Sequence, residues 1–447
     1  MSLQALGIKN KFDPVSIEAE VIAVEGLTVV VSDRLGLFSI GDRIEIESGS
    51  QDLLAEIVSI GDKVATALPF SALTGIKRGA KVVLLRGGDV VAPSAAWLGR
   101  IVDAFGRPID GKGALISGEV PRPLRNSPPS APTRARLGQV FDFGVKALNM
   151  FTPACEGQRI GIFSGSGVGK SALLSMIARN AACDYSVIAL IGERGREVRE
   201  FIEDHLGEGG LARSVIVVAT SDESALMRRE AAYLAMATAE YFRDDFNGGG
   251  GSVLCLMDSL TRFAMAQREI GLASGEPPAT KGFTPSVFSS LPALIERAGP
   301  SIDGRSPGYI TGVYSVLVEG DDHDEPVADN ARACLDGHIV LDRKIAERGR
   351  FPAVNVLRSS SRAPRHNLPK EITDLALRVR ASEAIYDDMQ EMVRIGAYHR
   401  GTNAEVDAAI DLHRQIESFL AQEVMVGVSA DEARKILTGL LPDGREV

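Results

Sequence analysis

A seven-residue stretch from Gly165 to Ser171 constrains the fold more than any other feature of the chain. It lies between an apolar extended run, residues 159–163, and a helix-forming stretch that starts at Ala172. A strand, a glycine-rich turn and a helix in this order are typical of a nucleotide phosphate cradle, because successive backbone N–H groups converge on a phosphate at the positive end of the helix. The predicted cradle consists of Gly165, Ser166, Gly167, Val168, Gly169, Lys170, Ser171 and Ala172.

Two residues of this stretch carry the expected chemistry. Lys170 is expected to reach the β- and γ-phosphates of ATP, and the Ser171 hydroxyl to coordinate Mg²⁺. The usual pattern begins with glycine, whereas this chain has Ser164 at that position, a small residue that we expect the turn to tolerate. The alternative is a plain glycine-rich loop, which the flanking strand and helix disfavour.

Composition excludes several other classes. The chain of 447 residues has 24% charged residues and a net charge of −10, which argues against general nucleic-acid binding. No run approaches 18 uninterrupted apolar residues, and the N-terminus lacks a basic region followed by an apolar one, so we expect neither membrane spanning nor secretion. The four cysteines are widely spaced and form no Cys-x-x-Cys pair, which gives metal and disulfide interpretations little support.

The pattern of apolar runs and turns predicts three domains: a small antiparallel β-barrel in residues 1–92, a central phosphate-cradle domain with a mostly parallel sheet in 93–369, and a helical domain in 370–447. The barrel strands are expected at 19–24, 27–32, 43–47, 54–60, 63–67 and 81–85, and the sheet strands at 159–163, 187–191, 214–219, 252–257, 310–318 and 337–342. A proline-rich linker is expected at 121–132. Capping boxes at Thr402-x-x-Glu405 and Ser429-x-x-Glu432 predict the starts of two C-terminal helices.

Three further residues are candidates for catalysis. Asp258 ends the apolar strand 253–257, and Glu193 follows the strand 187–191, so both carboxylates are expected at the edge where the phosphates bind. Asp258 could organise Mg²⁺ or simply cap its strand. Glu193 could polarise the attacking water, or could form a salt bridge with Arg194, Arg196 or Arg199.

Arg362 follows a strand-like segment, Phe351 to Leu357, and a run of three serines. An arginine on a polar turn is usually a solvated surface charge. Here it could also be a finger that reaches the nucleotide of a neighbouring subunit, because its planar cation suits a phosphoryl transition state.

These residues also carry a resemblance. Gly192-Glu193-Arg194, the runs at 239–244 and 98–110, the strand that ends at Asp258, and the segment 352–362 resemble the head subunits of rotary ATP synthases. The runs at 275–282, 291–299 and 335–341 are similar to the branch of flagellum-specific ATPases of bacterial type III protein export. The resemblance covers about residues 17–440 and implies a central domain of the RecA-like type.

The resemblance also implies roles and partners. Arg194 is expected to relay contacts near the γ-phosphate, and Phe351 to pack on adenine. The implied protein is a cytoplasmic ATPase at the inner face of the inner membrane that forms a homohexamer and works with an export gate, export chaperones and substrates. A stator-like regulator is also implied, although residues 5–8 are too short for the amphipathic docking helix typical of the family.

Three alternatives remain open at this stage. The ATPase of a virulence-type injectisome would share every catalytic residue. A ring subunit that binds nucleotide without hydrolysing it is disfavoured by Glu193, because noncatalytic head subunits typically lack a carboxylate there. A hexameric RNA translocase is disfavoured because the barrel region shows no aromatic and basic RNA-binding stretch.

Overall fold

The computed structural model describes residues 18–49, 52–85, 87–302, 306–318, 325–363 and 367–441. The N-terminal segment 5–8, which is too short for the docking helix typical of the family, lies outside these residues. The chain forms two compact units. The first consists of residues 1–89 with 223–227 and 266–285, and the second of the remainder. Among the described residues, none of the helices combines the length and the apolar character needed to cross a membrane.

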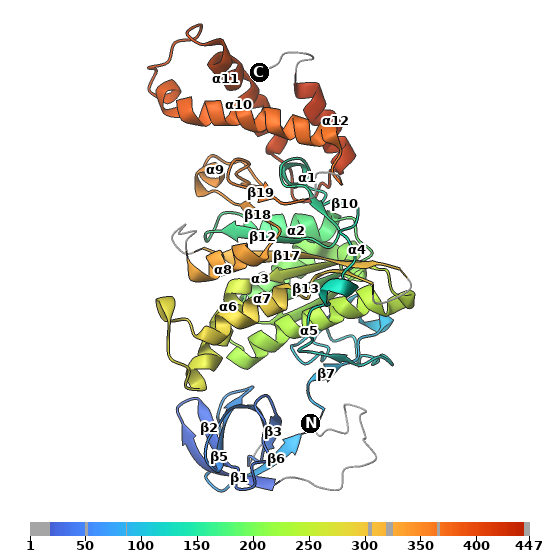
Figure 1. The fold of residues 1–447 in the computed structure, drawn as a ribbon, viewed down its shortest axis with the longest axis vertical. Coiled ribbons are helices and arrows are strands. Elements are labelled where there is room, and N and C mark those ends of the chain that lie inside the picture. The colour runs from blue at the N-terminus through green and yellow to red at the C-terminus, as the bar shows by residue number, and fades with distance from the viewer. Residues whose placement is uncertain are drawn as a thin grey trace. The chain divides into compact units, whose positions relative to one another are not determined.

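The first unit contains a closed antiparallel barrel of six strands with the order β1-β2-β5-β4-β3-β6 (Figure 1). Inward and outward residues alternate along β2, as the sequence pattern requires, and thirteen apolar side chains fill the interior. The predicted strands are confirmed, with bounds that differ by at most two residues. They are β1 (Glu18–Glu25), β2 (Thr28–Ser32), β3 (Arg43–Ile46), β4 (Leu53–Ile60), β5 (Val64–Pro69) and β6 (Lys81–Leu85).

The second unit is built on a sheet with the strand order β19-β18-β12-β17-β15-β13-β14-β8. The neighbours from β18 to β8 pair in parallel, and β19 and β16 add antiparallel pairings. The central strands carry almost no exposed side chains, as expected for parallel strands covered on both faces. The bounds are β8 (Arg100–Val102), β12 (Arg159–Ser164), β13 (Tyr185–Ile191), β14 (Ser214–Ala219), β15 (Ser252–Asp258), β16 (Gly299–Ser301), β17 (Gly308–Leu317), β18 (Gly337–Val340) and β19 (Ser360–Ser361).

Helices follow most of the sheet strands along the chain, as the alternating pattern predicts. They are α1 (Lys146–Phe151), α2 (Lys170–Asn180), α3 (Gly195–Glu200), α4 (Gly207–Ala212), α5 (Ala225–Asp244), α6 (Leu260–Ala273), α7 (Pro285–Ile295), α8 (Pro326–Cys334) and α9 (Arg343–Glu347). A π-helical turn (Phe201–Leu206) joins α3 to α4. Two small two-stranded pairings complete the unit, β7 (Val90–Val91) with β9 (Arg122–Pro123) and β10 (Val140–Phe141) with β11 (Ala154–Cys155). The predicted linker 121–132 is therefore mostly irregular, with β9 inside it.

Three helices end the chain, α10 (Lys370–Arg394), α11 (Ala404–Leu420) and α12 (Ala430–Leu440). Their apolar faces share one hydrophobic core with the sheet and α1. Barrel, parallel sheet and C-terminal helices confirm the predicted fold class. The domain boundaries after residues 92 and 369 stay a prediction.

Two local predictions are wrong. Residues 351–357, all described, form no strand: Pro352 lacks an N–H, and only Val354 pairs, in a single bridge with Leu341. The helix after Thr402 is capped one residue later, because Asn403 Oδ1 accepts hydrogen bonds from the backbone of Glu405 and Val406. The cap at Ser429 is confirmed by its bond from the N–H of Glu432.

Candidate active site

The glycine-rich turn joins β12 to α2 at the carboxyl end of the parallel sheet. Gly167 and Gly169 have φ angles of 75° and 91°, a left-handed conformation that suits glycine, and Lys170 is the first residue of α2. A Cβ on Gly169 would lie 3.1 Å from Cδ1 of Phe351. The Phe351 ring therefore lies against the cradle, and it is 43% exposed rather than part of the core.

Lys170, Glu193 and Asp258 meet at this edge of the sheet. Lys170 Nζ lies 3.1 Å from Oε1 of Glu193, and it also donates to Oδ1 of Asp258. Lys170 begins α2 after the glycine-rich turn, whereas Glu193 follows β13 and Asp258 ends β15. The three side chains are mostly buried, with 14%, 19% and 7% exposure. The structure therefore brings together three residues that the sequence separates by up to 88 positions.

The electrostatics of this cluster are those of one cation between two anions. Burial lowers the pKa of Lys170, but the charges of Asp258 and Glu193 reverse that effect, so the pKa of Lys170 is raised. Burial and repulsion from Asp258 raise the pKa of the Glu193 carboxyl despite the nearby lysine. Lys170 thus stays charged, and Glu193 gains proton affinity, as a general base requires.

The structure contradicts the alternative in which Glu193 pairs with a neighbouring arginine. Its carboxylate contacts Lys170, whereas Arg194, Arg196 and Arg199 pair with other glutamates on the exposed side of α3 and the turn after it. The backbone carbonyl of Glu193 accepts a hydrogen bond from the N–H of Ser221, in the turn that follows the neighbouring strand β14. The alternative salt bridge with a nearby arginine is therefore absent from this fully described segment, and the role of Glu193 on the attacking water stays a prediction.

Sequence reasoning missed Ser315. This residue lies on β17, is fully buried, and its hydroxyl donates a 2.6 Å hydrogen bond to Oδ1 of Asp258. The only signal in the sequence was a polar residue inside the apolar strand 310–318. Nothing in that pattern indicated which strand would lie beside Asp258.

The loop that carries Phe351 is held by groups that sequence reasoning also missed. Gln422, just after α11, donates its backbone N–H to the carbonyl of Phe351 at 3.0 Å. The Arg350 guanidinium donates to the carbonyls of Pro352 and Val354 at 2.8 and 3.0 Å. These contacts position the aromatic ring beside the cradle.

The two remaining candidates are exposed. Arg194 is 76% exposed at its side chain and lies 3.6 Å from Glu197, so it does not contact the Lys170 cluster in this state. Arg362 follows β19, the edge strand of the sheet. Its backbone N–H donates to Asp336 O at 2.7 Å, and its side chain has no partner within the described part of the chain.

The residues present fit a hydrated Mg²⁺ ion. The Ser171 side chain is exposed at the start of α2, and among the described residues no hydrogen bond reaches Oδ2 of Asp258. A hydroxyl and a carboxylate oxygen are hard ligands of the kind that Mg²⁺ prefers beside phosphates. A separate His and Glu group, Glu383, His413 and Glu417, lies in α10 and α11, away from the cradle motif.

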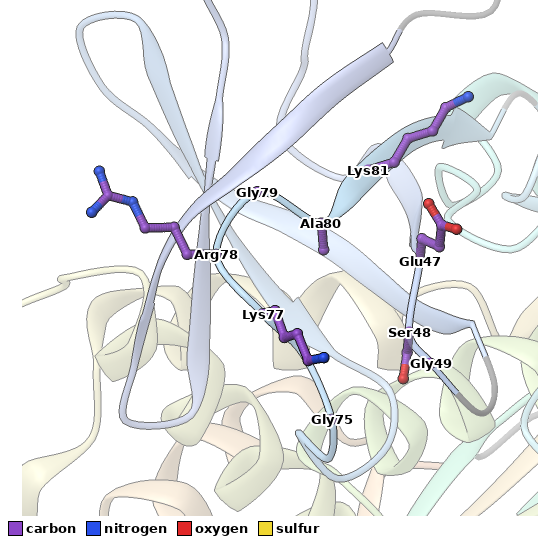
Figure 2. Close-up of a pocket in the computed structure, with 9 residues that line it drawn as sticks. All are labelled: Glu47, Ser48, Gly49, Gly75, Lys77, Arg78, Gly79, Ala80 and Lys81. Carbon is purple, nitrogen blue, oxygen red and sulfur yellow. The ribbon is translucent and has the colours of Figure 1, made fainter.

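Two hollows of the described surface lie away from the Lys170 cluster. One, of about 350 Å³, lies in the barrel unit and is lined by Glu47, Ser48, Gly49, Gly75 and residues 77–81 (Figure 2). The charged ends of Lys77, Arg78 and Lys81 diverge in Figure 2, so they do not converge on one anion. Another, of about 500 Å³, lies at the amino ends of β13 and β15. Neither contains the Lys170 cluster, and the chemistry points to the cradle.

This site is that of a P-loop nucleotide-binding protein, because a strand leads into the cradle and a buried lysine meets two carboxylates at the ends of neighbouring strands. Comparison with known families extends this assignment. Residues 21–86 match the β-barrel domain and residues 144–361 the nucleotide-binding domain of the ATP synthase alpha/beta family, and residues 368–439 match the EscN type III secretion ATPase C-terminal domain. The chain belongs to this family, within its group of flagellum-specific and type III secretion ATPases, and it is an ATPase.

Individual relatives agree with this placement. The chain is 52% identical to the flagellum-specific ATP synthase of Caulobacter vibrioides over 97% of both chains, and 46% identical to that of Bacillus subtilis over 90% of both. The assembled ATPase EscN of the enteropathogenic E. coli type III secretion system superposes with a TM-score of 0.87 at 39% identity, covering 94% of this chain and 99% of EscN. EscN in complex with its central stalk EscO gives a TM-score of 0.84.

Proposed function

We propose that this protein hydrolyses ATP with Mg²⁺ to energise export of flagellar proteins, including the release of export substrates from their chaperones. The observation that carries the ATPase chemistry is the convergence of Lys170, Glu193 and Asp258 beside the cradle. The flagellar assignment is supported by the extent and identity of the match to relatives with that name.

Each side chain has a distinct part in the proposed reaction. Lys170 leaves its two carboxylates and contacts the β- and γ-phosphates, supported by the backbone N–H groups of residues 165–172. Glu193 then becomes free to polarise the attacking water and accept its proton. Ser171 and Asp258 hold Mg²⁺, Asp258 partly through water, and the ion neutralises phosphate charge when it is bound. Phe351 packs on adenine, consistent with its exposed ring beside Gly169.

The active site is proposed to be shared between subunits of a homohexamer. Arg362 supports this arrangement because its exposed side chain follows an edge strand, where it can reach a neighbouring copy. In a closed ring each copy presents its cradle on one face and Arg362 on the other, which is a heterologous interface. Arg194 is proposed to join the γ-phosphate contacts after α3 shifts, since it pairs with Glu197 in this structure.

The test of the shared site mixes two inactive variants. Lys170→Ala removes the cation that faces the phosphates and nearly abolishes hydrolysis and weakens binding, whereas Arg362→Ala lowers turnover by about 10³ and leaves binding mostly intact. Some interfaces in mixed rings pair an intact cradle with an intact arginine, so we expect partial recovery of ATPase activity. If mixed rings form without recovery, or if a strictly monomeric preparation hydrolyses ATP at the full rate, the shared-site proposal fails.

The export role implies further partners, namely a stator-like regulator, an export gate, chaperones and their substrates, with peripheral association at the cytoplasmic face of the inner membrane. The second candidate is an injectisome ATPase, which the likeness to EscN supports. Deleting the gene in the source organism separates the two. Loss of filament proteins from the medium and loss of motility support the flagellar role, whereas normal motility contradicts it.

A further inference from the structure

Ser315 is the side chain that holds the Asp258 carboxylate in the folded sheet. β17 lies between β12 and β15, and Tyr314, the residue before Ser315, pairs with Met257, the residue before Asp258. Ser315 Oγ donates to Oδ1 of Asp258 at 2.6 Å, and both residues are buried, with 0% and 5% exposure. A short hydrogen bond between two groups held by adjacent strands restricts the rotation of the carboxylate.

The same oxygen accepts a second bond, from Lys170 Nζ. The two contacts differ in permanence. The Lys170 ammonium lies at the flexible end of a long side chain, and it is the group that phosphates attract. Ser315 lies in the middle of the sheet, and its hydroxyl has no other described partner to move to. When Lys170 departs, Ser315 alone keeps Oδ1 occupied.

We propose that Ser315 is a positioning residue that keeps Oδ1 of Asp258 engaged, so that Oδ2 remains the oxygen available to Mg²⁺ or its water. This inference deepens the proposed function and rests on it. Oδ2 has no partner among the described residues, which is consistent with this division between the two oxygens. Without the hydroxyl, the carboxylate can rotate, and the metal then binds a less ordered ligand.

A purely structural role predicts a different result. A buried serine that only satisfies a carboxylate affects folding stability and lowers nucleotide affinity to the same extent with and without Mg²⁺. A positioning role changes the dependence on Mg²⁺ specifically. The two are separable because a fluorescent ADP analogue can be titrated in EDTA and at a series of Mg²⁺ concentrations without turnover.

The matched control is Ser214→Ala. Ser214 is also fully buried on a strand of the same sheet, and its hydroxyl donates a 2.6 Å bond, but to the carbonyl of Gly210 instead of Asp258. Ser315→Ala is expected to raise the Mg²⁺ concentration for half-maximal nucleotide binding about tenfold, as for a lost hydrogen bond to a charged group, with affinity in EDTA unchanged. Ser214→Ala is expected to leave both quantities at the wild-type values.

Rescue by a hydroxyl completes the test. Ser315→Thr keeps the donor and is expected to restore the Mg²⁺ dependence, and Ser315→Cys, which has a weak donor and adds little volume, is expected to lie between wild type and alanine. The proposal is overturned if Ser315→Ala shows the wild-type Mg²⁺ dependence, or if it loses affinity equally in EDTA and in Mg²⁺. If the wild-type protein itself binds the nucleotide without any response to Mg²⁺, the proposed function fails instead.

Discussion

Replacing Glu193 with glutamine should move nucleotide affinity and turnover in opposite directions. The structure explains why, since Lys170 is held by Glu193 and Asp258 and must leave them to bind phosphate. At a separation of 3.1 Å and an effective dielectric constant of about 20, Coulomb's law gives about 5 kcal/mol for the Lys170–Glu193 attraction. Loss of hydration opposes most of that attraction in a buried pair.

The net effect on binding is therefore smaller than the Coulomb value. Asp258 still holds the lysine in the variant, so we expect Glu193→Gln to tighten ATP binding by about three- to tenfold, roughly 1 kcal/mol. Turnover is expected to fall by about 10² or more, because glutamine keeps the shape of the side chain but cannot accept a proton. Equilibrium titration gives the affinity, and single-turnover hydrolysis gives the rate of the chemical step.

Glu203→Gln is the matched control. Glu203 pairs with Arg199 at 2.9 Å on the exposed side of the molecule, so its loss should change neither quantity. A Glu193→Gln protein that loses ATP affinity while its single-turnover rate stays normal would refute two claims. These are that Glu193 competes with phosphate for Lys170, and that Glu193 acts in catalysis.

Three further outcomes follow from the charges in the second unit. Because the pKa of Glu193 is raised in the nucleotide-free protein, the acid limb of the pH profile of kcat/KM should lie above the ordinary glutamate pKa of about 4.3, and it should disappear in Glu193→Gln. The hydrogen bond from Arg100 holds the pKa of Asp110 well below its usual range, so this pair stabilises the fold fully above about pH 4 and less as the pH falls towards the folded pKa. In urea unfolding at pH 7, Asp110→Asn should lower the free energy of unfolding by roughly 1.5–3 kcal/mol. The difference in unfolding free energy between variant and wild type should become smaller below about pH 4, and an equally large difference at about pH 2 contradicts this. Glu240→Ala leaves the buried Arg297, which is 1% exposed, without the carboxylate that it binds through two hydrogen bonds. The free energy of unfolding should fall by about 3–5 kcal/mol, and the folded protein should keep its nucleotide affinity. A fall of less than about 1 kcal/mol contradicts this expectation.

The secondary structure of the barrel could be predicted because short-range physics determines it. Strands with one face in the core alternate apolar and polar residues, and glycine-containing turns separate them, so the predicted and observed bounds nearly coincide. The segment 351–357 could not be predicted in the same way. Its residues are apolar like those of a strand, but Arg350 and the Asn355 side chain bind its backbone groups locally. A pattern of side-chain polarity contains no information about such bonds.

The helix caps show the same limit on a smaller scale. Thr402 and Asn403 are both suitable N-cap residues, and the Glu405 that follows favoured the threonine. In the structure the Thr402 hydroxyl donates instead to the carbonyl of His399 at 2.7 Å, which leaves Asn403 to cap α11. Which of two adjacent polar residues caps a helix depends on the turn that precedes it.

The sequence by itself determined the cradle, its lysine and the positions of the two strand-end carboxylates, because each depends on residues adjacent in the chain. Only the tertiary structure decided which of these side chains meet. The order of strands in the sheet inserts β17 between β12 and β15, and this brings Ser315, 57 residues further along, against Asp258. It also directs Glu193 to Lys170 rather than to its neighbouring arginines. Strand order results from packing the whole core, so local patterns cannot specify it.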